Sequence, residues 1–562
     1  MDNHSRKPDE EIVDLTKIKT KTKEFWHSLK SKKSSTKDNN SSQAMHTEHR
    51  NTERKEQHNQ EKSTFHEFKE YTTHNARWII PVFLILIAVI FSVYLRTMPL
   101  RMPIADDWAQ NTVYNYYQNQ LTNQINEQYP NLPEQNKGAL VQREWQTYYV
   151  QNQQLIDSQI TQLAEEYRNK FRDDSGTLYI LGIDPYHYYR LVSNVLTYGH
   201  PGTTIKNGEP WDEYFVYPEG RSAGKDFHAY FCALLHKVMN IGSSVPLMTS
   251  FFYIGVIFSA LATIPAFFIG RKVSGNNVGG FFAALIVATS AFFVSRTTGE
   301  SSDTDVYTVF FPLLVLWLFI EAYEARTLKR GIILSLAAGL ATGFFSAAWI
   351  GGWWYIFLFA LAAAGLTLII HALIHYKELK TYIRSTAVTN PLVLLGTYIV
   401  SSAIFVSIFS SFSDFVNGFL GPLGFLRIKA VGVTSLWPNI RTTVAELNVP
   451  PFSAVVDQLG GAILLIIAVI GIVLALRRRV DGERDYKVAL LLAMWLVASL
   501  FATTKGVRFI LQVIPVLALA VGIGLGILWS VISEWLTRTL HVNRKIAMVL
   551  VFLLFSLLFI KP

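Results

Sequence analysis

The feature that most constrains the fold is a series of about eleven apolar stretches, each close to the length of a membrane crossing. Half of the 562 residues are hydrophobic and only 17% are charged. Because the backbone must satisfy its own hydrogen bonds in hydrocarbon, such stretches fold as α-helices. The chain is therefore predicted to be a polytopic α-helical membrane protein. The predicted helices cover 78–94, 247–270, 278–294, 306–322, 331–348, 350–372, 392–412, 453–476, 487–504, 508–530 and 545–561.

The basic residues predict the topology. Loops rich in Lys and Arg stay on the cytoplasmic side of a membrane, and the basic clusters of this chain occupy alternate loops. The N-terminus is therefore expected in the cytoplasm of a multi-pass cell-membrane protein. We take the net charge of +9 as a signal of orientation, and we expect no nucleic-acid partner. The clusters are Arg271-Lys272, Arg326/Lys329/Arg330, Lys377/Lys380/Arg384, Arg477-Arg478-Arg479 and Arg538/Arg544/Lys545.

The chain divides into a tail and a membrane domain. Residues 1–77 carry 16 Lys and Arg and 13 Asp and Glu but few large apolar side chains, which predicts a disordered basic cytoplasmic tail. Residues 78–562 form the membrane domain, with a large first outer loop at 98–246 and a later outer loop at 411–452. Within the first loop, 107–172 is predicted to form a helical hairpin around Pro130 and Pro133. The single cysteine, Cys232, excludes an internal disulfide framework and Cys-ligated metal sites.

Three predicted outer loops contain acidic residues beside apolar stretches. Asp184 stands before a proline and an aromatic cluster, Asp303 and Asp305 open the stretch at 306, and Glu446 lies inside the loop 411–452. Carboxylates two residues apart can share a hard divalent cation. Each motif alone also has a simpler interpretation: a helix cap at Asp303 and Asp305, a turn former at Asp184, and a solvated charge at Glu446. Because all three fall on one side, with Arg508, they suit a cation and a phosphate-bearing substrate.

At these residues the sequence resembles the catalytic subunit of oligosaccharyltransferase of the archaeal and bacterial single-subunit type. The resemblance covers roughly 178–530 and consists of four motifs in order: the Asp184 motif, the Asp303-Thr304-Asp305 motif, Thr443-Val444-Ala445-Glu446, and Arg508. It implies a GT-C membrane glycosyltransferase with 11–13 transmembrane helices. The implied reaction moves an oligosaccharide from a polyprenyl (dolichyl-type) phosphate or diphosphate carrier to asparagine of Asn-x-Ser/Thr in an acceptor polypeptide. The active site is then expected to be extracytoplasmic.

The resemblance also implies roles for the acidic residues. Asp184, Asp303 and Asp305 would surround Mn²⁺ or Mg²⁺, and Glu446, with Asp184, would reach the acceptor amide. An amide nitrogen is a poor nucleophile because its lone pair is delocalised. Carboxylates that accept its N–H groups would polarise it for attack on the sugar.

Two arginines complete the implied site. Arg296, seven residues before Asp303, would support the acidic cluster, and Arg508 would bind the carrier phosphate. With the cation, they would neutralise charge on the departing phosphate.

The sequence departs from the family pattern in two respects. Family members usually have thirteen spans, whereas about eleven are predicted here. The family also carries a globular domain after its last span, with a Trp-Trp-Asp-Tyr-Gly motif, and this chain is expected to lack it. Its Trp pair, Trp353-Trp354, is followed by Tyr355 inside the stretch 350–372, where we interpret it as part of an interfacial aromatic belt.

Two other functions remain open at this stage. Another GT-C enzyme would transfer a sugar from a polyprenyl-phosphate donor to a lipid or a hydroxyl group. A lipid or solute transporter would show charged residues in mid-span or internally repeated halves, and the sequence shows neither.

Overall fold

The fold is described from a computed structural model for residues 78–215, 217–349, 351–426, 445–480 and 483–559. The predicted tail, 1–77, lies outside the described residues. The chain separates into two compact units, Met1–Ile79 and Ile80–Pro562, and the description below concerns the second.

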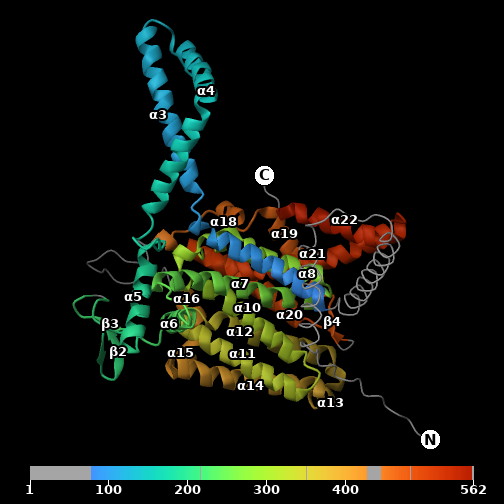
Figure 1. The fold of residues 1–562 in the computed structure, drawn as a ribbon. Helices are drawn as coiled ribbons and strands as arrows, with labels where there is room; N and C mark the ends of the chain where they lie inside the picture. Colours follow the sequence, from blue (N-terminus) through green and yellow to red (C-terminus); the bar gives the residue numbers. More distant parts are fainter. Residues whose placement is uncertain (1–77, 216, 350, 427–444, 481–482, 560–562) are drawn as a thin grey trace, which may run out of the picture. The chain divides into compact units, whose positions relative to one another are not determined.

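Each predicted apolar stretch coincides with a helix or a pair of helices (Figure 1). Within the described residues, seven helices are able to cross a membrane by length and composition, and the pair α18 and α19 would make an eighth. The apolar helices α8 and α20 are shorter, with 13 and 17 residues. These findings confirm a polytopic α-helical fold. The helices are Trp78–Leu100, α7 (Leu247–Ser274), α8 (Asn277–Thr289) with α9 (Ala291–Ser295), α10 (Tyr307–Tyr323), α11 (Leu328–Ala348), α12 (Trp354–Ile374), α14 (Thr386–Phe409), α18 (Phe452–Gln458) with α19 (Ala462–Ala475), α20 (Lys487–Thr503), α21 (Ile510–Thr539) and α22 (Arg544–Ser556).

One predicted helix is broken. The stretch 453–476 forms α18 and α19, whose axes differ in direction by 80°. Between them Gly460 and Gly461 have φ values of +94° and +99°, in the region that favours glycine. The Gly-Gly pair inside the apolar run was the local signal of this break.

Helix α21 forms the centre of the membrane domain. It packs against α7, α8, α19, α20 and α22. In the most apolar part of the helix, 89% of the residues are buried. Small residues allow close packing with α8: a Cβ atom added at Gly522 would lie 2.6 Å from the carbonyl oxygen of Gly279. Such contacts replace the hydrophobic driving force that is missing between helices in lipid.

The first predicted outer loop contains the expected helical hairpin. Its helices are α3 (Ile104–Gln128) and α4 (Glu134–Asn169), joined through the Pro130–Pro133 turn. The hairpin has its own small apolar cluster around Val113, Tyr117 and Ile156. Figure 1 shows it projecting away from the membrane helices. The loop continues with α5 (Ile183–Tyr198), the three-stranded antiparallel sheet β1 (Thr204–Lys206), β2 (Glu209–Asp212) and β3 (Arg221–Ser222), and α6 (Phe227–Met239).

The remaining elements are short. They lie in the connections between the longer helices, and the predicted outer loop 411–452 contains α15 and α16. The short helices are α13 (Leu379–Ile383), α15 (Phe412–Gly418) and α16 (Gly421–Leu426), and β4 (Arg479–Val480) pairs with β5 (Glu483–Arg484).

A buried ionic network lies at the C-terminal end of α10. Glu324, 8% exposed at its side chain, accepts hydrogen bonds of 2.7 and 2.8 Å from Arg478 and lies 3.5 Å from Lys272. Lys487 and Asp485 join the network through contacts of 3.4 Å to Glu324 and 2.6 Å to Arg478. Two of the predicted cytoplasmic basic clusters thus meet here, about 25 Å along α10 from its other end.

Candidate active site

The first acidic motif lies at the start of α5. Gly182, with φ of +86°, precedes the helix, and Asp184 stands in its first turn. The Leu181 N–H donates a 2.8 Å hydrogen bond to the carbonyl of Glu300, so the first motif is tied by the backbone to the second. Residues far apart in the sequence are therefore brought to the same place.

The second motif connects α9 to α10 through two short 3-10 helices, η2 (Gly299–Ser301) and η3 (Thr304–Val306). Asp303 caps η3 by accepting the backbone N–H of Thr304 at 2.5 Å, as the capping interpretation predicts. Asp305 is instead 4% exposed and ion-paired. Burial, the charge of Asp305 and, less strongly, that of Asp184 raise the pKa of Asp303 to about 6. The charges of Asp305 and Asp184 thus both act on Asp303.

Two arginines neutralise part of this charge. Nε of Arg296 donates to Oδ2 of Asp305 at 2.7 Å, and its Nη2 donates to Glu446. Arg508 lies 3.4 Å from Glu446 and 4.0 Å from Asp305. Burial alone would lower the pKa of Arg296, but the charges of Asp305 and Glu446 outweigh it and raise that pKa.

The third motif is held against the loop that carries Arg508. Glu446 lies in η5 (Ala445–Leu447), Arg508 lies in η6 (Val507–Phe509), and the Val507 N–H donates to the Asn448 carbonyl at 3.0 Å. Glycine at 506 is needed for this approach, because a Cβ atom there would lie 2.7 Å from the carbonyl oxygen of Glu446. Residues 442–444 of this motif lie outside the described residues.

The six residues predicted for the site are therefore connected, although not as one metal cluster. Among the described residues, no three His, Cys, Asp or Glu side chains are arranged to hold a metal ion. The donor atoms nevertheless fit a hard divalent cation in kind. Among the described residues, neither Asp184 nor Asp303 forms an ion pair with an arginine. The charge of Asp184 contributes to the raised pKa of Asp303, and a bound cation would relieve this repulsion. Asp305 would have to leave its arginine partners to become a third ligand.

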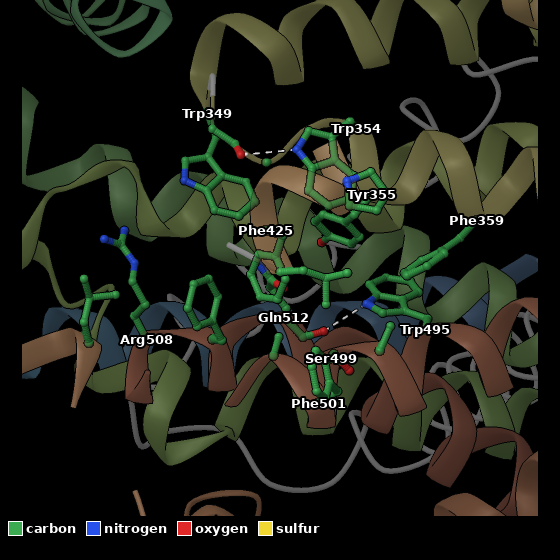
Figure 2. A pocket seen from close by; sticks show the side chains of 18 residues that line it. Trp349, Trp354, Tyr355, Phe359, Phe425, Trp495, Ser499, Phe501, Arg508 and Gln512 are labelled. Atoms are coloured by element: carbon green, nitrogen blue, oxygen red, sulfur yellow. Dashed lines mark hydrogen bonds between the residues drawn. The ribbon is translucent and has the colours of Figure 1, made fainter. Parts of the chain in front are cut away.

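An apolar pocket of about 500 Å³ adjoins the acidic cluster. In Figure 2, Arg508 lies at one side of the pocket, and Phe359 and Trp495 lie at the opposite side. Eight of the eighteen residues that line the pocket are aromatic: Trp349, Trp354, Tyr355, Phe359, Phe425, Trp495, Phe501 and Phe509. The pocket is thus a mainly apolar cavity with the cationic group of Arg508 in its wall.

The sequence interpretation missed this pocket and assigned its tryptophans differently. Trp353 is 2% exposed and stacks against Phe415 at 6.4 Å, whereas Trp354 lines the pocket. Trp353 is therefore internal, whereas the partly buried Trp354 belongs to the pocket wall. The sequence offered a weak signal, since Trp349, Trp354 and Trp495 all fall at or within apolar stretches.

The fold and the site define a polytopic α-helical membrane protein with clustered carboxylates and arginines beside an apolar pocket. Residues 154–561 match the family described as "Oligosaccharyl transferase STT3, N-terminal", and the chain belongs to that family. The match includes Asp184, Arg296, Asp303, Asp305, Glu446 and Arg508.

Individual relatives carry related names. A "Dolichyl-phosphooligosaccharide-protein glycotransferase" of Methanococcus voltae is 29% identical over 430 residues, which cover 70% of this chain and 46% of that protein. A protein of the same name from Methanocaldococcus jannaschii is 26% identical, over 66% of this chain and 49% of that one. The chain thus spans about half the length of these relatives. Among solved structures, the "Archaeal oligosaccharyltransferase AglB from Archaeoglobus fulgidus" has 20% identity and a TM-score of 0.47, covering 68% of this chain and 51% of that one.

Proposed function

We propose that this chain transfers an oligosaccharide from a polyprenyl phosphate or diphosphate carrier to the asparagine of Asn-x-Ser/Thr in proteins, at the extracytoplasmic face. One observation carries the proposal: Arg508 contacts the acidic cluster and also lines the apolar pocket. A donor that combines an isoprenoid chain with a phosphate needs this combination. The names of the two methanogen relatives and the family membership support the same reaction.

In this proposal Arg508 binds the carrier phosphate, and the isoprenoid chain occupies the pocket. The phosphate is anionic and would compete with Glu446 for the guanidinium group, 3.4 Å away. Glu446 would then be free to accept an N–H from the acceptor amide, together with Asp184. Arg296 would keep Glu446 in place, and it would hold Asp305 until a cation binds.

Mn²⁺ or Mg²⁺ is proposed as the cofactor, held by Asp184, Asp303 and, after release from its arginines, Asp305. When bound, the ion would stabilise negative charge on the departing phosphate. We also propose that the site faces the extracytoplasmic side of the membrane. It lies at one end of α10, and the basic clusters around Glu324, which are predicted to be cytoplasmic, lie at the other end.

The test is transfer by the whole chain reconstituted in liposomes with a lipid-linked oligosaccharide. The acceptors are an Asn-x-Thr peptide and the matching Gln-x-Thr peptide, and mass spectrometry measures the product. We expect glycan on the asparagine peptide only, and about hundredfold less with Asp303→Asn. Asp174→Asn, which changes an exposed carboxylate of the first predicted outer loop, is the control with unchanged transfer. Transfer to a lipid or a hydroxyl acceptor, with none to asparagine, would contradict the proposal.

A further inference from the structure

A fully buried arginine lies close to the candidate active site and has not been assigned a role. Arg96, 0% exposed, belongs to the first membrane helix, outside the 154–561 family match. Among the described residues, no carboxylate forms an ion pair with it. A buried, unpaired charge in a membrane protein is costly and calls for a functional explanation.

All of its hydrogen bonds go to neutral oxygen atoms. Nη1 donates to Ser92 within its own helix at 3.0 Å and to the Ala288 carbonyl at 2.9 Å, and Nε donates to Oγ1 of Thr297 at 2.8 Å. The guanidinium group also lies over the ring of Phe293, 4.7 Å from its centroid. Nη2 is buried and has no hydrogen-bond partner in the part of the chain that the structure describes.

These contacts lie on both sides of a break in the chain. Helix α8 ends at Thr289, Ser290 leaves the helical conformation with ψ of 117°, and α9 begins at Ala291. Ala288 precedes the break, whereas Phe293 and Thr297 follow it. Arg96 therefore fixes the orientation of α9 relative to α8. A lysine, with a single point charge, would not reproduce this forked geometry.

The segment fixed in this way carries Arg296. Thr297 follows it directly, and Arg296 connects Asp305 to Glu446. The segment also packs closely against α7, because a Cβ atom added at Gly255 would lie 2.9 Å from the Thr297 carbonyl oxygen. The residue that follows Arg296 is thus held both by α7 and by the Arg96 guanidinium.

We infer that Arg96 is a positioning residue: it holds the α9 segment so that Arg296 reaches both Asp305 and Glu446. The positioning itself does not depend on the proposed function, and only its effect on transfer rests on it. Loss of Arg96 should leave the donor site around Arg508 intact, because Arg96 contacts neither η6 nor the pocket. Transfer should therefore lose kcat, with little change in KM for the donor.

The first experiment measures hydrogen exchange of a peptide covering 290–300. With Arg96→Met or Thr297→Val we expect exchange at least about tenfold faster than in the wild type, because the contacts across the break are lost. Thr297→Ser keeps the accepting hydroxyl, so exchange in this variant should stay as slow as in the wild type. Arg478→Met removes an arginine that is 11% exposed at its side chain, in the network around Glu324, and should leave this peptide unchanged.

The second experiment measures transfer kinetics of the same variants. Arg96→Met and Thr297→Val should lower kcat about ten- to hundredfold, with donor KM within about twofold of the wild type. Thr297→Ser should be near normal. If Arg96→Met does not fold, Thr297→Val tests the same contact from the other side.

The outcomes are distinguishable. Unchanged exchange in both Arg96→Met and Thr297→Val, or an equal loss of kcat in Arg478→Met, would overturn the inference. Faster exchange in Arg96→Met and Thr297→Val, together with no glycan transfer by the wild-type chain, would refute the proposed function and leave the positioning role supported.

Discussion

Glu324→Gln tests whether the buried ionic network stabilises the membrane domain. Glu324 faces three cations, and its pair with Arg478 uses both carboxylate oxygens, at 2.7 and 2.8 Å. Burial would raise the pKa of Glu324, but Arg478 and Lys487 outweigh it and lower that pKa from 4.5 to about 2. This difference corresponds to about 3 kcal/mol of stability at neutral pH.

Mutational data on buried ion pairs give a similar magnitude. Removing one partner of such a pair costs roughly 3–5 kcal/mol, and Asp485 would still compensate Arg478 here. We therefore expect Glu324→Gln to lower the free energy of unfolding by about 3 kcal/mol. The assay is unfolding in mixed micelles at pH 7, followed by tryptophan fluorescence.

Glu321→Gln is the matched control. Its side chain lies one turn earlier, is 27% exposed and contacts Lys272 at 2.8 Å, so its loss should cost at most about 1 kcal/mol. The effect of Glu324→Gln should also depend on pH. Because the pKa is lowered in the folded state, the stabilisation is present above pH 4.5 and lost as pH falls towards 2. Equal effects of the two variants at pH 7 would refute this account of the network.

Three further predictions concern the site and the membrane. Because the pKa of Asp303 is raised to about 6, the apparent Mn²⁺ affinity measured by calorimetry should fall about tenfold from pH 7 to pH 5; an affinity independent of pH would exclude Asp303 as a ligand. In a Cys232→Ser background, a cysteine at the exposed position 214 should react with an impermeant thiol reagent on intact cells. A cysteine at the exposed position 326 should react only after lysis, and the reverse pattern would show that the predicted topology is inverted. Ala498→Phe narrows the apolar pocket and should raise KM about tenfold for long-chain polyprenyl donors but not for short-chain ones; equal effects on both would place the isoprenoid elsewhere.

Features encoded by local patterns were predictable from the sequence. Apolar runs correctly located the membrane helices, because a chain in lipid has few alternatives to the helix. The prolines at 130 and 133 correctly marked the turn between α3 and α4. The break between α18 and α19 was missed, since hydropathy does not register the positive φ of Gly460 and Gly461.

Pairing within the site could not be predicted in the same way. Asp303 illustrates the difficulty: the capping interpretation is correct for its contact with Thr304, yet its pKa reflects charges from Asp305 and Asp184. Arg96 was missed because its contacts reach about 200 residues along the chain, to Thr297. A single basic residue near the end of an apolar stretch is usually a topology signal, and only the fold shows that this one is internal.

The ion pairs of the site also determine where negative charge remains unbalanced. Asp184, Asp303, Asp305 and Glu446 lie near two guanidinium groups, and among the described residues Asp184 and Asp303 form no ion pair with an arginine. A divalent cation would balance that charge where it is concentrated. A donor phosphate would instead be attracted to Arg508, and in binding there it would release Glu446 for the acceptor amide. Under the proposed function, donor binding therefore prepares the carboxylate that the acceptor needs, and the two substrates are favoured to bind in that order.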